Sequence, residues 1–219
     1  MKTHPRVSGN GNVDPLFQQY EEKFVLDYSK LQKIAEGYQA LGRKVVITIG
    51  SWDGLHIGQV RYIIRARAAG NLLIVAFDTD RAIKLYKGPL RPLVPQEERA
   101  EMLTYLDAVS FVTAIDDVDE QGRWQYELLK VIKPDVFVAV VDSYPKEQLN
   151  EIQSFVKEPV VVLERQADTS TSAVIAKMMK ESFLMSKDDL LDAFETVLNK
   201  KMKRKDPVHA DTTVHTKSA

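Results

Sequence analysis

The chain has 219 residues, of which 44% are hydrophobic and 28% charged, and its formal net charge is −1 at pH 7. This length and composition fit one α/β domain with a sizeable core, and the near-zero charge gives no electrostatic reason to expect nucleic acid as a partner. The absence of cysteine excludes disulfides, thiolate nucleophiles and cysteine-based zinc sites. Because the sequence also lacks a signal-peptide core and an apolar run of about 18 residues, we expect a cytoplasmic protein with no membrane partner.

The first part of the chain predicts a disordered segment, a helix and a strand. Residues 1–15 are rich in Gly, Asn and Pro without periodicity, so we expect them to be disordered. Apolar residues recur at helical spacing from Leu31 to Leu41, and Ser29 is predicted to cap a helix that ends at Gly42. The β-branched run 45–49 predicts a buried strand, and a glycine turn leads from it into a helix that stops at Gly70.

Four more apolar runs predict strands that alternate with helices. The expected strands are residues 72–77, 109–113, 135–141 and 159–163, with helices that include 124–132 and 145–156. Short connections between them favour a Rossmann-like doubly wound sheet of about five parallel strands, within a single domain of residues 16–200 and a core of 44–180. A helix after residue 172 and a last amphipathic helix at 187–202 follow, and residues 203–219 are expected to be disordered.

The glycine turn after the first strand is typical of a phosphate site. A strand that feeds a helix N-terminus through Gly50 leaves backbone N–H groups aimed at one point, with the helix dipole behind them. Gly58 lets a ligand approach the backbone, and His56 supplies a donor that can also carry charge. Ligands of such sheets bind beyond the carboxyl ends of the strands, where Asp78 and Asp142 also emerge.

These segments resemble a known family. The turn Gly50-Ser51-Trp52-Asp53-Gly54-Leu55-His56-Ile57-Gly58 resembles the glycine–aromatic–Asp–x–x–His–x–Gly–His signature of the cytidylyltransferase-like nucleotidyltransferases. The pairs Lys87-Gly88, Arg91-Pro92 and Glu98-Arg99 and the segment 169–172 fall where that family has its lysine–glycine loop, Arg-Pro, Glu-Arg and Ser-Thr-Thr segments. Their order and spacing, from about residue 31 to 180, are most similar to the bacterial ADP-heptose-synthase adenylyltransferase and glycerol-3-phosphate cytidylyltransferase branch.

The resemblance implies nucleotidyl transfer. AMP from ATP, favoured over CMP from CTP, would pass to the phosphate of a small metabolite such as a sugar or polyol phosphate, with release of pyrophosphate. The catalytic residues implied are His56, Gln59, Lys87 and Arg91, which would position and neutralise phosphate oxygens. Mg²⁺ would bridge the phosphates, and no residue is expected to ligate a metal directly, because no carboxylate cage is visible.

The resemblance also implies which residues bind each substrate. Some of these residues also have a structural interpretation. For Asp53 the favoured role is to brace the turn, Arg99 could pair with Glu98 or Glu101 or orient the loop, and Ser170 and Thr171 would cap a helix in any fold. The predicted substrate-binding residues are Asp78, Lys87, Arg91 and Arg99. The predicted nucleotide-binding residues are Gly50, Ser51, Trp52, Asp53, His56, Gly58, Asp142, Ser170 and Thr171.

The sequence departs from the family pattern at three places. Gln59 replaces the second histidine and can never carry positive charge, which could cost on the order of 3 kcal/mol in the transition state. Trp52 stands where phenylalanine is usual, and Val140 and Val141 stand where the relatives have glycines. These departures motivate a second hypothesis, a catalytically impaired nucleotide-binding protein acting as a sensor or scaffold. A homodimer is plausible through the apolar last helix.

Overall fold

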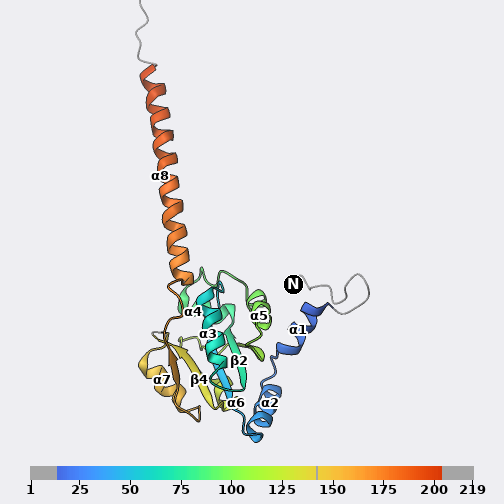
Figure 1. Ribbon diagram of the computed structural model, residues 1–219. Helices are drawn as coiled ribbons and strands as arrows, with labels where there is room; N and C mark the ends of the chain where they lie inside the picture. The colour runs from blue at the N-terminus through green and yellow to red at the C-terminus, as the bar shows by residue number, and fades with distance from the viewer. Residues whose placement is uncertain (1–13, 142, 204–219) are drawn as a thin grey trace, which may run out of the picture. The chain divides into compact units, whose positions relative to one another are not determined.

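The computed structural model describes residues 14–141 and 143–203, and the fold is a parallel sheet covered by helices (Figure 1). The sheet has five strands, all parallel, in the order β3-β2-β1-β4-β5, which confirms the predicted Rossmann-like class. Strand order changes direction between β1 and β4, the point at which doubly wound sheets bind ligands. The strands are β1 (Val45–Gly50), β2 (Leu72–Asp78), β3 (Phe111–Ile115), β4 (Val136–Val140) and β5 (Val161–Leu163).

Helices connect the strands and in places differ from their predicted bounds. The second helix begins after Asp27, which caps it in place of the predicted Ser29. A helix from Pro15 was not predicted; Asp14 caps it by accepting the N–H of Leu16 at 2.9 Å. The helices between residues 14 and 171 are α1 (Pro15–Lys23), α2 (Tyr28–Ala40), α3 (Ile57–Arg67), α4 (Asp80–Lys87), α5 (Gln96–Thr104), α6 (Glu127–Ile132) and α7 (Lys146–Gln153).

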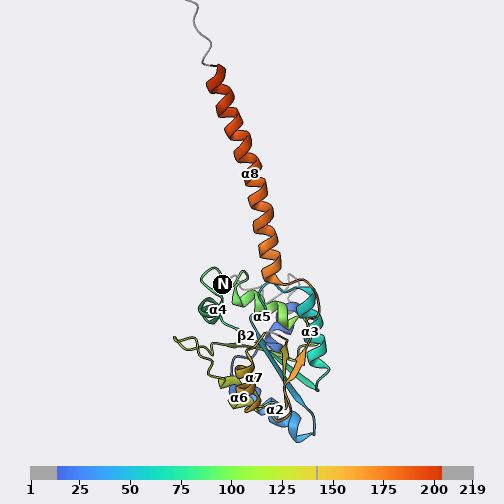
Figure 2. The ribbon, with the colours of Figure 1, turned by 90° about the vertical axis from the view of Figure 1, so that its left-hand side faces the viewer.

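The neighbouring strands β1 and β2 are buried on both faces, as the sequence predicts. In β1, Val45 and Ile47 pack into one hydrophobic cluster and Val46 into another, because successive side chains point to opposite faces. The first cluster includes residues of α2, α6 and α7, and the second includes residues of α3 and α5. Figure 2 shows α3 on one side of the sheet and α6 and α7 on the other. This packing holds the carboxyl ends of the strands at one edge.

The C-terminal part forms one helix, α8 (Thr171–Lys203), where the sequence predicts two. By its contacts the chain divides into two units, residues 1–171 and 172–219. No helix among the described residues is long and apolar enough to cross a membrane. Of the segments predicted to be disordered, residues 1–13 and 204–219 lie outside the described residues, whereas Pro15 and Lys203 belong to α1 and α8.

Candidate functional site

The turn between β1 and α3 is anchored to the sheet by Trp52. This residue has a φ of 50°, and its indole N–H donates to the carbonyl of Ala76 in β2 at 2.9 Å. The ring lies 5.9 Å from that of Tyr62 and is only 5% exposed. The indole ring, which was predicted to bind nucleotide, therefore points into the core. Its bond to Ala76 fixes the turn to β2. An indole N–H must find an acceptor when buried, and Ala76 supplies it.

His56 is the N-cap residue of α3 and packs directly over its first turn. Gln59 bonds back to it, since the Gln59 side-chain oxygen accepts the N–H of His56 at 3.1 Å. A Cβ at Gly58 would lie 3.0 Å from Cε1 of His56 and 3.2 Å from Cβ of Ala167. Any larger residue at Gly58 would push the imidazole away from the helix N-terminus. Gln59 thus takes the acceptor role of a capping box, and Gly58 makes room for the ring.

One of the two ring nitrogens of His56, Nδ1, is buried and makes no hydrogen bond to the described residues. Burial lowers the pKa of His56, so the neutral imidazole is favoured near neutral pH. With Nδ1 packed against the N-terminus of α3, we assign the proton to Nε2, which leaves that nitrogen as a donor. A phosphate beside the ring would favour the charged form.

Asp53 ties the turn to the loop between α4 and α5. Its carboxylate accepts the N–H groups of Leu93 at 2.8 Å and Val94 at 3.0 Å, and Nε of Arg91 at 2.7 Å. Asp53 is 1% exposed, and although burial raises its pKa, these donors outweigh burial and hold it below the usual value. The carboxylate thus holds the loop that carries Arg91, which is one of the two alternatives that the sequence left open.

Lys87 reaches the turn from the end of α4. Its ammonium donates to Oγ of Ser51 at 2.7 Å and lies 5.5 Å from the ring centre of Tyr86. Desolvation lowers the pKa of Lys87, and the nearby Arg91 lowers it further. An anion beside Lys87 would offset this lowering and stabilise the charged ammonium.

The side chain of Arg99 lies in the core and supports the site through hydrogen bonds. Its guanidinium is fully buried and donates to the carbonyls of Ser51 at 2.6 Å and Asp78 at 2.9 Å. It also bonds the carbonyl of Val94 at 3.0 Å and the carboxylate of Asp80 at 2.6 Å. Arg99 therefore joins the ends of β1 and β2 to α4 and to the loop after it. These partners occupy the guanidinium that the sequence assigns to substrate.

Asp78, at the end of β2, is the acidic group of the site. It is 1% exposed; Tyr86 donates to Oδ2 at 2.5 Å, and Oδ1 is buried without a hydrogen-bond partner among the described residues. Burial raises the pKa of Asp78 to about 6, against the opposing effect of the Tyr86 hydroxyl and of Lys87. An unpaired buried carboxylate oxygen is costly and favours a ligand donor opposite it.

The start of α8 contacts the other side of the turn. Oγ1 of Thr171 donates to the carbonyl of Asp53 at 2.6 Å, and a Cβ at Gly54 would lie 3.1 Å from Cγ2 of Thr171. Gly54 also has a φ of +66°, which favours glycine. Ser170 directly precedes Thr171 and also has an interaction partner in the structure. Asp142, the remaining predicted nucleotide-binding residue, lies outside the described residues.

A family comparison agrees with this arrangement of strand, turn and helix. A family model described as cytidylyltransferase-like matches residues 47–205, which is most of the chain. The chain belongs to the cytidylyltransferase-like family of nucleotidyltransferases. This confirms the family predicted from the sequence.

Curated relatives of this cytidylyltransferase-like chain are longer proteins. The bifunctional protein HldE of Wolinella succinogenes is 40% identical over 154 residues, which are 70% of this chain and 31% of the relative. The bifunctional protein HldE of Nitratiruptor sp. is 32% identical over 157 residues, 72% of this chain and 32% of the relative. The chain thus spans about a third of the length of these relatives. A solved lipopolysaccharide core biosynthesis protein from Thermoplasma volcanium GSS1 is 20% identical with a TM-score of 0.48, covering 57% of this chain and 100% of that one.

Two aromatic residues of the cytidylyltransferase-like site were not predicted from the sequence. Tyr86 bonds Asp78, and its ring lies 5.7 Å from that of Trp124 in the loop after β3. Tyr144 donates to the carbonyl of Ile49 at the end of β1 at 2.8 Å. Only the position of Tyr86 beside the loop lysine could have indicated a role, since the contact with Trp124 spans 38 residues of sequence.

Proposed function

We propose that the chain transfers AMP from ATP to the phosphate of a small phosphorylated sugar or polyol. An oxygen of the acceptor phosphate attacks the α-phosphorus of ATP, the bond to the bridging oxygen of the β-phosphate breaks, and pyrophosphate leaves with that electron pair. The observation that carries the proposal is the convergence of His56, Lys87 and Arg91 on one glycine turn at a helix N-terminus. The acceptor phosphate is already a nucleophile, so the reaction needs positioning and charge neutralisation more than a general base.

Each residue contributes a donor to this reaction. His56 would donate from Nε2 to an oxygen that gains charge as the α-phosphorus becomes pentacoordinate, a contribution worth roughly 3 kcal/mol for one well-placed donor. Lys87 and Arg91 would neutralise the triphosphate or the acceptor phosphate. The first turn of α3 adds backbone N–H groups at the same point. Thr171 would place the start of α8 near the β- and γ-phosphates.

Mg²⁺ would bind here through the phosphates of the substrates. Among the described residues, no group of three or more His, Asp or Glu side chains could hold a metal ion. Mg²⁺ accepts a few protein ligands when substrate phosphates supply the others, so the donor set here fits an ion carried in with the nucleotide. When bound, the ion would neutralise phosphate charge.

Pyrophosphate release tests the proposal. The protein would be incubated with ATP or CTP, Mg²⁺ and a panel of sugar and polyol phosphates that includes a heptose phosphate. We expect pyrophosphate with ATP and at least one sugar phosphate, and a loss of roughly a hundredfold or more in kcat for His56→Ala. No pyrophosphate from any combination would contradict the proposal. A preference for CTP would correct the donor and leave the reaction class intact.

The second candidate function, a nucleotide-binding sensor or scaffold, rests on Gln59 and the end of β4. The N–H of Val141 donates to the carbonyl of Leu163 at 2.8 Å, and β-branched side chains stand at the end of β4 where the family has glycines, which would narrow the approach to a nucleotide. Tight ATP binding by calorimetry without turnover would favour this candidate. A gain of turnover in Gln59→His would then show that the site remains able to catalyse.

A further inference from the structure

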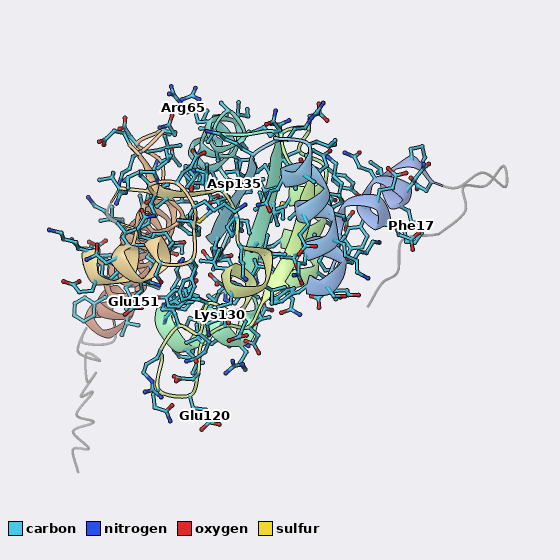
Figure 3. The ribbon with its side chains drawn as sticks, turned by 90° about the horizontal axis from the view of Figure 1, so that it is seen from below. Phe17, Arg65, Glu120, Lys130, Asp135 and Glu151 are labelled. Carbon is cyan, nitrogen blue, oxygen red and sulfur yellow. The ribbon has the colours of Figure 1, made fainter. Side chains whose placement is uncertain are left out.

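A cavity of about 610 Å³ lies at the carboxyl edge of the sheet, between the loop after β3 and the start of α7. One wall comes from the loop after β3, including Arg123 and Trp124, and the other from the start of α7, including Glu147 and Gln148. Both segments follow the carboxyl ends of their strands, and β1 and β2 lie between those strands in the sheet. In Figure 3 Glu120, on the first loop, and Glu151, on α7, lie away from Asp135 at the amino end of β4.

Contacts between side chains connect this cavity to the glycine turn. Trp124 lines the cavity, its ring lies tilted against that of Tyr86 at 5.7 Å between ring centres, and Tyr86 donates to the carboxylate of Asp78. Next to it, Lys87 bonds Ser51 of the turn. Tyr86 therefore lies between Trp124 of the cavity and Asp78 of the proposed phosphate site, and Lys87 is its neighbour in the chain.

Hydrogen bonds within the loop after β3, and from this loop to α7, hold it in a defined conformation. Asp119 accepts the N–H groups of Gln121 at 3.0 Å and Arg123 at 2.9 Å, and also pairs with the Arg123 guanidinium at 2.9 Å. Tyr126 has a φ of 58°, a strained conformation for a non-glycine residue, and donates to Glu151 of α7 at 2.6 Å. These bonds fix the distance between the two walls and the orientation of the Trp124 ring.

The charges that line the cavity suit hydroxyl groups and disfavour phosphate. Glu147 and Glu151 supply two carboxylates, while the lining cation Arg123 is already paired with Asp119. Carboxylates only accept hydrogen bonds when ionised, and Gln148 both donates and accepts. A polyol offers a hydroxyl donor at every carbon and an apolar C–H face for the indole, whereas a nucleobase has few donors for two carboxylates.

From this geometry we propose that the cavity holds the hydroxyl-bearing carbon skeleton of the acceptor, stacked on Trp124 and bonded to Glu147 and Gln148. The inference rests on the proposed function, because the acceptor's phosphate would then lie at Lys87, next to the Tyr86 ring that contacts Trp124. Trp124, Glu147 and Gln148 are specificity-determining residues in this arrangement. A cavity of this size exceeds what glycerol needs and accommodates a sugar ring with side-chain hydroxyls.

The kinetic test compares a long and a short acceptor. Trp124→Ala is expected to raise KM for a sugar phosphate about tenfold, and Glu147→Gln several-fold, with KM for ATP and for glycerol phosphate changed less than about twofold. Glu21→Gln, which changes an exposed glutamate of α1, is the matched control and should change nothing. An increase confined to KM for ATP, or an equal increase for both acceptors, would overturn the inference.

A binding test separates this inference from the proposed function. The protein has two tryptophans, and one of them, Trp52, is buried beneath the turn. Without nucleotide, a sugar phosphate should change tryptophan fluorescence saturably in the wild type and not in Trp124→Phe, and inorganic phosphate should have no effect. If no pyrophosphate forms with any acceptor but this signal is present, the proposed function fails and the sugar site stands. Absence of the signal, with pyrophosphate still released, overturns the inference alone.

Discussion

At the scale of single residues, Gln59 combines two roles that the sequence could not separate. The position was expected to hold a histidine, and the structure uses its side-chain oxygen to accept the N–H of His56. A histidine there could accept this N–H only as a neutral ring, because the protonated imidazole has no acceptor nitrogen. The substitution is therefore a structural feature of the turn as well as a change in charge.

Two variants of Gln59 separate capping from charge. Gln59→Glu keeps an acceptor for the His56 N–H and adds a negative charge at a helix N-terminus, so we expect Tm to be kept or raised. The same charge should repel triphosphate and raise KM for ATP about tenfold. Gln59→Ala should lower the free energy of unfolding by about 1 kcal/mol with a smaller effect on KM. Equal KM values for the two variants would contradict an electrostatic role for this position.

Burial of the Asp78 carboxylate is predicted to lower the free energy of unfolding increasingly above pH 4, with the full penalty reached above pH 6. Its pKa is raised from 3.8 to about 6 by burial, so between these values the folded state binds more protons than the unfolded state. The free energy of unfolding therefore falls as pH rises through this window, and the penalty persists at higher pH. Asp78→Asn should raise it at pH 8 by on the order of 3 kcal/mol and have little effect near pH 4.

Thermal melts from pH 4 to pH 8 measure this effect. Asp107→Asn, at an exposed aspartate, is the control and should shift Tm equally little at every pH. If Asp78 contributes to substrate binding as predicted from the sequence, Asp78→Asn should also lose activity, since stability gained at a functional group commonly costs function. A stability gain independent of pH would show that the carboxylate's charge is not its cause.

At the scale of elements, the loop between α4 and α5 depends on one buried ion pair. The side chains of Arg91 and Asp53 are 14% and 0% exposed. Asp53→Ala leaves Arg91 and two backbone N–H groups without their acceptor, so we expect the free energy of unfolding to fall by about 3 kcal/mol. Because Arg91 would lose its fixed position, KM for ATP should also rise.

A matched pair on the surface provides the control. Arg81 and Asp116 form an ion pair of the same chemistry whose side chains are 49% and 47% exposed. Asp116→Ala should cost less than about 1 kcal/mol in urea denaturation, since water screens and replaces such pairs. Similar losses for the two alanine variants would mean that the loop is not held by burial of the Asp53 pair.

The elements whose burial is decided locally were predictable. The β-branched run 45–49 lies within one residue of β1 because both faces of a central parallel strand must be apolar. Residues 124–126 were predicted helical and are not, since Tyr126 bonds Glu151 across 25 residues and takes a left-handed conformation. The glycine turn was recognisable as a phosphate site. For Arg99, orienting the loop was one of the alternatives, but its actual partners were not predictable, because they lie up to 48 residues away.

At the scale of the whole molecule, the candidate site lies in the first of the two units, and all of α8 after Thr171 lies in the second. The side-chain contacts described for the site come from residues 51–171, which lie in the first unit. In the second unit α8 exposes large apolar side chains, with Met178, Phe183 and Phe194 each more than 60% exposed. An exposed apolar face of this length is typical of an association surface.

A chain that ends after Lys180 tests this separation. We expect it to keep the Tm and the KM for ATP of the full chain, because Thr171 and its bond to Asp53 remain. Light scattering measures the mass of both chains, and the homodimer predicted from the sequence requires the full chain to have twice its formula mass and the shortened chain to be a monomer. A shortened chain that folds but no longer binds ATP would show that residues beyond 180 contribute to the site. Equal association of the two chains would place the dimer contact in the first unit.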